Sequence, residues 1–169
     1  MDQANVNFAV FEDGDEYLGM ASVGMPTLTN LTQSINGAGI AGNIEAIIKG
    51  HVDAMTLTLN FRTTTPQSVQ LSEIRRHTID LRVAQQAEYP VDNTIGALAE
   101  KHVMVVIPKT HNVGTVAPAS PSNGSGEYAV RYWATWLGGR KVREIDPMNF
   151  IYVVDGVDYL ADVRKALGK

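Results

Sequence analysis

The sequence contains no cysteine, which excludes a disulfide framework and thiolate chemistry. Its apolar runs are all shorter than the roughly 20 residues that a membrane-spanning helix needs, so we expect no membrane anchoring. Residues 1–7 lack a basic start followed by an apolar core, and we therefore expect no signal peptide. Only 19% of the residues are charged and the net charge is −4, which gives no support to a nucleic-acid-binding surface.

Motifs of enzymatic and metal chemistry are also missing. The four histidines (51, 77, 102 and 111) include no pair spaced four residues apart on a helical pattern, so a zinc site has no support. The sequence has neither a Walker loop nor a G-x-S-x-G nucleophile elbow. The acidic residues at 12–16 lack the further oxygen ligands of a calcium loop and are interpreted as a solvated turn. We expect a protein that is not an enzyme and has no catalytic residue, cofactor or metal.

One glycine-rich segment has a nucleotide-type pattern. Residues 37–42 read Gly-Ala-Gly-Ile-Ala-Gly and match G-x-G-x-x-G, which binds a dinucleotide only when a helix follows it in a parallel βαβ unit. Only residues 43–49 separate Gly42 from Gly50, and their alternation fits a strand as well as a helix. A loop between two strands is the favoured interpretation, and a small-ligand or nucleotide-binding β-domain using this loop is the alternative.

Alternating segments predict a chain made mainly of strands. The clearest is Met55–Phe61, where apolar residues alternate with Thr56, Thr58 and Asn60. An Asp13-Gly14 hairpin turn joins two strands, the continuous apolar run before Pro108 predicts a strand buried on both faces, and Gly138-Gly139 forms a second tight turn. The predicted strands are 6–11, 17–23, 27–35, 55–61, 77–84, 102–107, 127–137 and 140–145, and 112–126 is predicted to be a surface loop.

Two short helices complete the predicted fold. The first is a weak helical pattern over 67–76, and the second is an amphipathic helix capped by Asp158 that we expect to pack on the strands. With no linker and no long repeat, residues 1–169 form one domain. The predicted fold class is mainly β (α+β): two packed antiparallel sheets forming a β-sandwich or barrel, with a short C-terminal helix and one more short helix.

The C-terminal segment has the most specific pattern in the chain. It reads Glu-Ile-Asp-Pro-Met-Asn at 144–149, Val-Asp-Gly-Val-Asp at 154–158 and Leu-Ala-x-x-Arg-x-x-Leu-Gly at 160–168. This series resembles the C-terminus of the major tail tube protein family of contractile-tailed phages and R-type pyocin-like (tailocin) particles. The resemblance also covers residues 6–61, while 62–127 resembles the family weakly.

The resemblance implies a structural role. Family members form hexameric rings whose inner strands complete one β-barrel, and the rings stack into a hollow tube that is driven through a target envelope when the sheath contracts. The implied partners are further copies of the chain, tail sheath protein, baseplate and tail-terminator proteins, and a tape-measure protein or DNA in the lumen. The implied location is a virion tail or tailocin particle, assembled in the bacterial cytoplasm and released extracellularly. A ring of a related secretion machine shares the fold and is a second alternative.

The same resemblance assigns expected sites to three groups of residues. The polar strand faces are expected to line the lumen, through Thr27, Thr29, Gln33, Thr56, Thr58 and Asn60. The glycine-rich loop is expected to make contacts between rings, through Gly37, Gly39, Ile40 and Gly42. The local positive cluster of Arg140, Lys141 and Arg143 is either a solvated strand face or a contact with the sheath or a neighbouring subunit.

Overall fold

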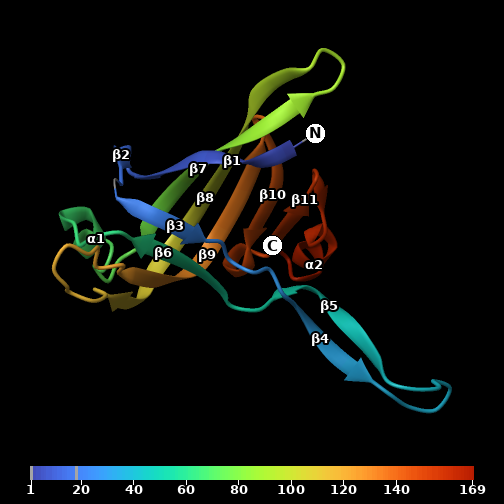
Figure 1. Ribbon diagram of the computed structural model, residues 1–169. Coiled ribbons are helices and arrows are strands. Elements are labelled where there is room, and N and C mark those ends of the chain that lie inside the picture. Colours follow the sequence, from blue (N-terminus) through green and yellow to red (C-terminus); the bar gives the residue numbers. More distant parts are fainter. Residues whose placement is uncertain (1, 18) are drawn as a thin grey trace.

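The computed structural model describes residues 2–17 and 19–169 as a mainly antiparallel β structure (Figure 1). One large sheet has the strand order β12-β11-β10-β9-β8-β7-β1-β2, and β3 and β6 join it through β9. The strands are β1 (Asp2–Glu12), β2 (Asp15–Glu16), β3 (Met20–Gly24), β4 (Asn30–Ile35), β5 (Ile44–Val52), β6 (Met55–Phe61), β7 (His77–Tyr89), β8 (Thr94–Asn112), β9 (Ser125–Leu137), β10 (Arg140–Asp146), β11 (Ile151–Val154) and β12 (Val157–Asp158).

Two layers of this sheet pack around one core, as the sequence predicted. Leu57 and Leu59 of β6 are fully buried and pack in one cluster with Val10, Ile79 and Met104 of β1, β7 and β8. Strand β9 belongs to both layers, because its first half pairs with β6 and its second half pairs with β10. The packed antiparallel layers are therefore joined by hydrogen bonds through β9 instead of being separate sheets.

Strand β9 changes face at a bulge. The pairing of β9 with β8 shifts register between Tyr132 and Val130, which leaves Arg131 as an extra residue. Strict alternation along the strand predicted over 127–137 puts Tyr132 and Trp136 on the face of Val130, and this prediction is wrong beyond the bulge. Trp133 is the residue that joins Val130 in the core, with 4% of its surface exposed.

Several predicted strand boundaries are also wrong. Strand β7, predicted to end at residue 84, continues to Tyr89, and β8, predicted to begin at residue 102, begins at Thr94. The strand predicted over 17–23 is divided, since β2 returns along β1 whereas β3 pairs with β6; residue 18 lies outside the described residues. Strand β8 continues past Pro108, which lies beside a second register shift with β9. Proline is tolerated there because bulges and strand edges leave backbone groups outside the regular ladder.

The helices are short. Helix α1 (Pro66–Gln70) begins at Thr65, whose side chain accepts a hydrogen bond from the backbone N–H of Ser68, and it is half the length predicted. A single 3₁₀ turn, η1 (Pro147–Asn149), follows β10, and α2 (Ala161–Ala166) ends the fold. Leu160, and not Asp158, is the N-terminal boundary residue of α2.

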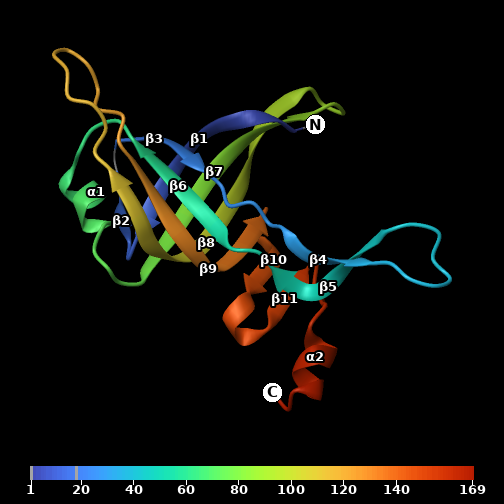
Figure 2. The same cartoon turned by 90° about the horizontal axis from the view of Figure 1, so that it is seen from below.

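Strands β4 and β5 form a separate hairpin that extends away from the body, which we call the arm (Figures 1 and 2). Its two strands pair only with each other among the described residues, from Ile35 opposite Ile44 to Asn30 opposite Val52. The glycine-rich residues 37–42 form the turn at its tip. The predicted loop between two strands is therefore confirmed, and both strands that flank it are antiparallel.

Candidate assembly surfaces

The described residues give no support to a metal or nucleotide site. No group of three or more His, Asp or Glu side chains in 2–17 and 19–169 could hold a metal ion. None of the helices described is both long and apolar enough to cross a membrane. The glycine-rich loop lies between antiparallel strands, so it lacks the parallel βαβ unit on which a dinucleotide phosphate site depends.

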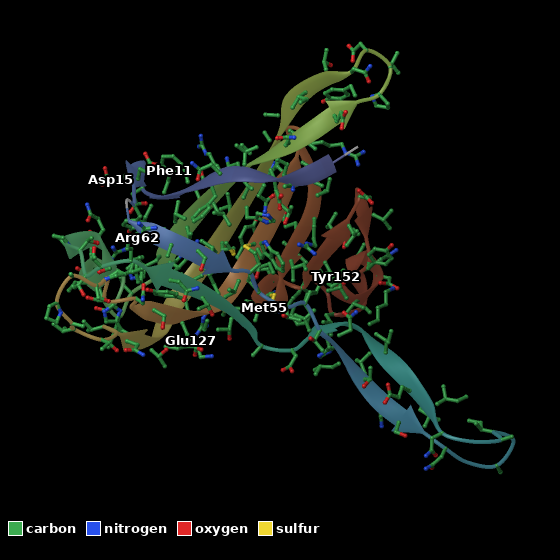
Figure 3. All side chains as sticks on the ribbon, viewed as in Figure 1. Phe11, Asp15, Met55, Arg62, Glu127 and Tyr152 are labelled. Carbon is green, nitrogen blue, oxygen red and sulfur yellow. The ribbon has the colours of Figure 1, made fainter. Side chains whose placement is uncertain are left out.

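A polar face covers the outside of the layer that contains β6. Thr56, Thr58 and Asn60 alternate with the buried apolar residues of that strand, as predicted. Asn60 donates from Nδ2 to Ser22 Oγ at 2.9 Å, and Lys109 donates from Nζ to Thr56 Oγ1 at 3.1 Å. Glu127 of β9 pairs opposite Thr58, and it lies at the margin of the body (Figure 3). We define the polar face by these residues: Ser22, Thr56, Thr58, Asn60, Lys109 and Glu127.

This layer has two open strand edges. Strand β3 pairs only with β6 among the described strands, which leaves its other side without a ladder. Strand β7 pairs with β8 only as far as Val106, so residues 107–112 of β8 are paired with β9 alone in the described chain. Open edges carry unpaired N–H and C=O groups, which natural sheets cover or pair.

The remaining residues predicted to line a lumen lie apart from the polar face. Thr27 and Thr29 are exposed in the segment that leads into the arm, where the Thr29 carbonyl accepts from Asp53 N–H at 2.8 Å. Gln33 is exposed on β4, within the arm itself. The structure therefore brings Thr56, Thr58 and Asn60 together and places Thr27, Thr29 and Gln33 along a path toward the arm.

The arm exposes an unusual amount of apolar surface. Ile47 has 65% of its surface exposed and Ile44 has 53%, and the other exposed aliphatic residues on the two strands are Leu31, Ile35 and Ile48. A two-stranded hairpin is marginally stable in water by itself. The arm side chains stand clear of the body (Figure 3), so the described chain leaves this surface uncovered. Sequence patterns do not reveal this surface, because the alternation of Ile44, Ala46 and Ile48 indicates a strand but does not show whether its side chains are covered.

The arm tip is sterically open. A Cβ placed on Gly37, Gly39 or Gly42 would meet no atom within 4 Å. The backbone N–H of Ile40 donates to the Gly37 carbonyl at 3.1 Å and closes the turn. Each of the predicted inter-ring residues therefore lies on a surface that another molecule could reach.

Helix α2 holds the base of the arm. Leu160 is buried against Gly50 of β5, and Lys49 forms an ion pair with Asp162 at 2.7 Å. Arg164 forms an ion pair with Asp158 and donates to the Phe150 carbonyl at 2.6 Å. The hydrogen bond from Arg164 lowers the pKa of the Asp158 carboxyl, so this carboxyl remains charged at neutral pH. These contacts confirm that the helix packs on the protein's own strands.

The three basic residues of β10 are largely engaged by their own chain. Arg140 pairs with Asp155 at 3.3 Å, and Lys141 pairs with Glu144. The Arg143 guanidinium stacks 4.0 Å from the Trp133 ring centroid, and burial lowers the pKa of this guanidinium. The cluster is therefore not a single free positive patch, and Arg140 is its most exposed member.

The two tryptophans differ in burial, because residues three apart along a strand face opposite sides. Trp133 lies in the core and donates its indole N–H to Nδ1 of His102 at 3.1 Å. Trp136 is half-buried between two cations, with Lys101 Nζ 5.3 Å and Lys141 Nζ 5.5 Å from its ring centroid. The position of Trp136 at the surface keeps it available as a contact residue.

Comparison with known proteins gives one consistent result. The family model described as phage tail tube protein FII matches residues 4–168. The tail tube protein of Escherichia phage P2 is 27% identical over 161 residues, covering 94% of this chain and 93% of that protein.

Solved structures of an extracellular contractile injection system, PVC, share the fold. Its sheath/tube terminator in the extended state has a TM-score of 0.55 at 11% identity, with 78% of this chain and 94% of that chain covered. A chain of its sheath-tube complex in the extended state has a TM-score of 0.52 at 12% identity, with 77% and 88% covered. The match to the family model spans nearly the whole chain and shows the family. The chain belongs to the phage tail tube protein FII family, as a structural tail tube component and not an enzyme.

Proposed function

We propose that six copies of this chain form a ring by joining their open strand edges. The polar layer has the order β3-β6-β9-β8, in which each strand is antiparallel to the next. Residues 107–112 of β8 in one copy would therefore meet β3 of the next copy in the antiparallel sense. The two open strand edges are the observation that carries this proposal, because closure into a barrel would remove them altogether.

In such a ring, the polar face lines the bore. Thr56, Thr58 and Asn60 supply neutral hydroxyl and amide groups, while Lys109 and Glu127 contribute opposite charges that balance. Thr27, Thr29 and Gln33 continue this polar lining toward the arm. A hydrated surface with few strong binding points suits the passage of DNA or a tape-measure protein.

The arm connects rings in this proposal. Its exposed aliphatic residues need a partner, and its tip carries Gly37, Gly39, Ile40 and Gly42 on an open surface. Burial of these side chains against a neighbouring copy would stabilise both the arm and the stack, by roughly 25 cal/mol per Å² of apolar area. The tube is therefore stabilised by repeated contacts between subunits as well as by the fold of each subunit.

The outer partners follow from the relatives. The PVC chain lies in a sheath-tube complex, and we propose that this chain likewise functions inside a sheath, in a phage tail or tailocin particle. Arg140, Lys141 and Arg143 lie in β10 on the other side of β9 from β6, and we assign them to contact with the sheath or a neighbouring subunit. Baseplate and tail-terminator proteins would close the ends, with assembly in the bacterial cytoplasm before release. A ring of a related secretion machine is the alternative, because it shares the fold.

Native mass spectrometry and electron microscopy of the purified chain test this proposal. We expect a species of six 18.3 kDa chains, and rings or tubes with a central bore. A chain that stays monomeric at high concentration and shows no rings would contradict it. Addition of the sheath protein from the same particle should decorate the tubes; tubes from a secretion machine that lacks this sheath would remain bare.

A further inference from the structure

The β7–β8 hairpin ends in an exposed apolar tip. Figure 1 shows this yellow-green hairpin extending beyond the rest of the sheet. Val91 has 98% of its surface exposed, Ile95 has 68% and Tyr89 has 48%, and we call these three residues the tip patch. Asp92 lies within the turn and accepts hydrogen bonds from the backbone and side chain of Thr94. It forms no ion pair with any described residue, so the tip presents three apolar side chains and one free negative charge.

A groove of about 610 Å³ lies on the face of the sheet that is turned away from the core. Most of its lining is apolar, with Val103, Val105 and Ile107 from β8, Tyr132 from β9 and Met148 from η1. Asp146 and Asn149 also line it, and the Asp146 carboxylate accepts hydrogen bonds from the backbone N–H groups of Met148 and Asn149 and from the Asn149 side chain. Arg76 and Arg131 are on its rim, and both are exposed. Neither arginine forms an ion pair within the described part of the chain; the Arg131 side chain donates a hydrogen bond to the Met148 sulfur at 3.7 Å. The groove is therefore complementary to the tip in polarity, and also in charge, because its two arginines outnumber the single Asp146 carboxylate.

The tip and the groove lie at opposite ends of one strand. Arg76 and Thr78 mark the start of β7 beside the groove, and Tyr89 ends this 13-residue strand at the tip. At about 3.3 Å per residue, the two surfaces are roughly 40 Å apart. They cannot meet within one molecule, and a contact between two molecules would be head-to-tail and would repeat along the strand direction.

We propose that the β7–β8 tip of one copy docks in this groove of a copy in the adjacent ring. Val91 and Ile95 enter the apolar groove, and Asp92 pairs with Arg76 and Arg131 on its rim. The contact is heterologous, so each copy uses its tip on one side and its groove on the other. This inference rests on the proposed stacking of rings, and it gives the stack a direction and a second connection besides the arm.

Charge reversal tests the contact, because all three charged side chains are at the surface. Asp92→Arg also removes the hydrogen bonds that Asp92 accepts from Thr94, whereas the double variant at Arg76 and Arg131 leaves this turn intact. Asp92→Arg, and separately the double variant Arg76→Glu with Arg131→Glu, should each raise the protein concentration needed for tubes about tenfold or more. Rings should remain visible by electron microscopy. The triple variant that combines these changes should restore tubes at the wild-type concentration. Asp15→Arg, which makes the same charge change in exposed strand β2, is the matched control and should stack normally.

Disulfide cross-linking gives an independent readout, because the natural chain has no cysteine. A chain carrying Val91→Cys and Met148→Cys should form, on oxidation of assembled tubes, a ladder of multiples of 18.3 kDa. The pair Val116→Cys and Met148→Cys should not, since Val116 is equally exposed but lies in the β8–β9 loop.

The outcomes separate this contact from the proposed function. Tubes of the Val91→Cys, Met148→Cys chain that give no ladder on oxidation would overturn the contact and leave the ring proposal standing. Unchanged assembly of Asp92→Arg would do the same. A ladder from Ile47→Cys with Met148→Cys in its place would show that the arm fills the groove. If the Arg76→Glu, Arg131→Glu variant forms normal tubes but no longer binds the sheath, the sheath protein fills the groove. Absence of rings in the wild-type chain contradicts the proposed function, and a ladder from the Val91→Cys, Met148→Cys chain without rings would support the contact alone.

Discussion

At the scale of single residues, Gly50 allows the arm and the C-terminal helix to meet. Its φ of +73° is a conformation that side chains with a Cβ adopt at a cost, and a Cβ there would lie 2.2 Å from Leu160 Cδ2. Gly50→Ala should therefore destabilise the protein twice, through backbone strain of about 1–2 kcal/mol and through overpacking of about 1–3 kcal/mol. Thermal unfolding measures the loss.

The control for this variant is Gly139→Ala. Gly139 has a φ of +81° but a Cβ there would meet no atom within 4 Å, so this variant isolates the backbone contribution. Equal losses for the two alanines would contradict the packing of Leu160 on Gly50. The arm and α2 should also become more accessible to protease in Gly50→Ala alone.

Tyr128 gives the fold a defined response to alkaline pH. Burial raises the pKa of this phenol from 10.0 to about 12, and its hydroxyl is buried without a hydrogen-bond partner among the described residues. The pKa of Tyr128 is higher in the folded state than in the unfolded state. Its contribution to the free energy of unfolding is therefore fully present below about pH 10 and is lost as the pH rises to about 12. The loss is about 2–3 kcal/mol, since one pKa unit corresponds to about 1.4 kcal/mol.

Tyr128→Phe should remove this alkaline loss and leave neutral stability unchanged or slightly higher, because no hydrogen bond is broken. Denaturant unfolding at pH 7 and pH 11 measures both effects. Tyr132→Phe is the matched control on the same strand, where burial also raises the phenol pKa but the ring lies at the groove. A Tyr128→Phe variant that loses stability at pH 7 would reveal a partner for the hydroxyl.

The least predictable residue from sequence was Glu12. It lies among acidic residues beside an Asp-Gly turn, and that neighbourhood predicts a solvated side chain. The folded chain instead buries it, with His77 Nδ1 at 2.6 Å, Arg75 Nη1 at 3.2 Å and Tyr17 as a third partner. His77 and Arg75 are more than 60 residues away in sequence, so no local pattern could indicate this network.

At the scale of elements, the arm combines weak intrinsic stability with strong apolar exposure. Replacing Ile44 and Ile47 by Ser should leave the body folded, since both side chains project from the arm into solvent. Assembly into tubes should be lost, because the apolar area available to a neighbour is reduced. Circular dichroism checks the fold and electron microscopy checks assembly. Val116→Ser, an equally conservative change at an exposed loop position, should assemble normally, and tubes from the double variant would contradict the role of the arm.

Sequence patterns predicted those elements whose own residues determine them. Strand β6 was predicted with its observed bounds, because its strict alternation requires one buried face. The tight turn at Gly138-Gly139 was also correct, since both residues need positive φ. Residues 17–23 were predicted as one strand, whereas β2 pairs with β1 and β3 pairs with β6. Sequence alone does not indicate this division, because strand pairing depends on residues that are distant in the chain. The same limit hid the open edges and the groove, which exist only once β8 and β9 are in register.

At the scale of the whole molecule, any change on the polar face would occur six times in the proposed ring. Thr58→Asp adds one negative charge to each copy beside Glu127, and these charges would all face the same bore. Rings of this variant should be unstable at low ionic strength and recover in salt, because screening shortens to about 3 Å at 1 M. Analytical ultracentrifugation at rising salt concentration measures the recovery. The Thr27→Asp variant carries its charge at a less enclosed position, so its assembly should depend less on salt. Assembly of Thr58→Asp that does not change with salt would exclude the polar face from the bore.

Strand β9 has a mechanical consequence, because its backbone bonds to β6, β8 and β10 along its length. Sliding one layer past the other would require rupture of the backbone hydrogen bonds that β9 makes in both layers, whereas two sheets held by side chains alone can slip. The subunit should therefore resist shear as one rigid unit, and in the proposed tube a force applied to the outer layer should be transmitted to the polar face.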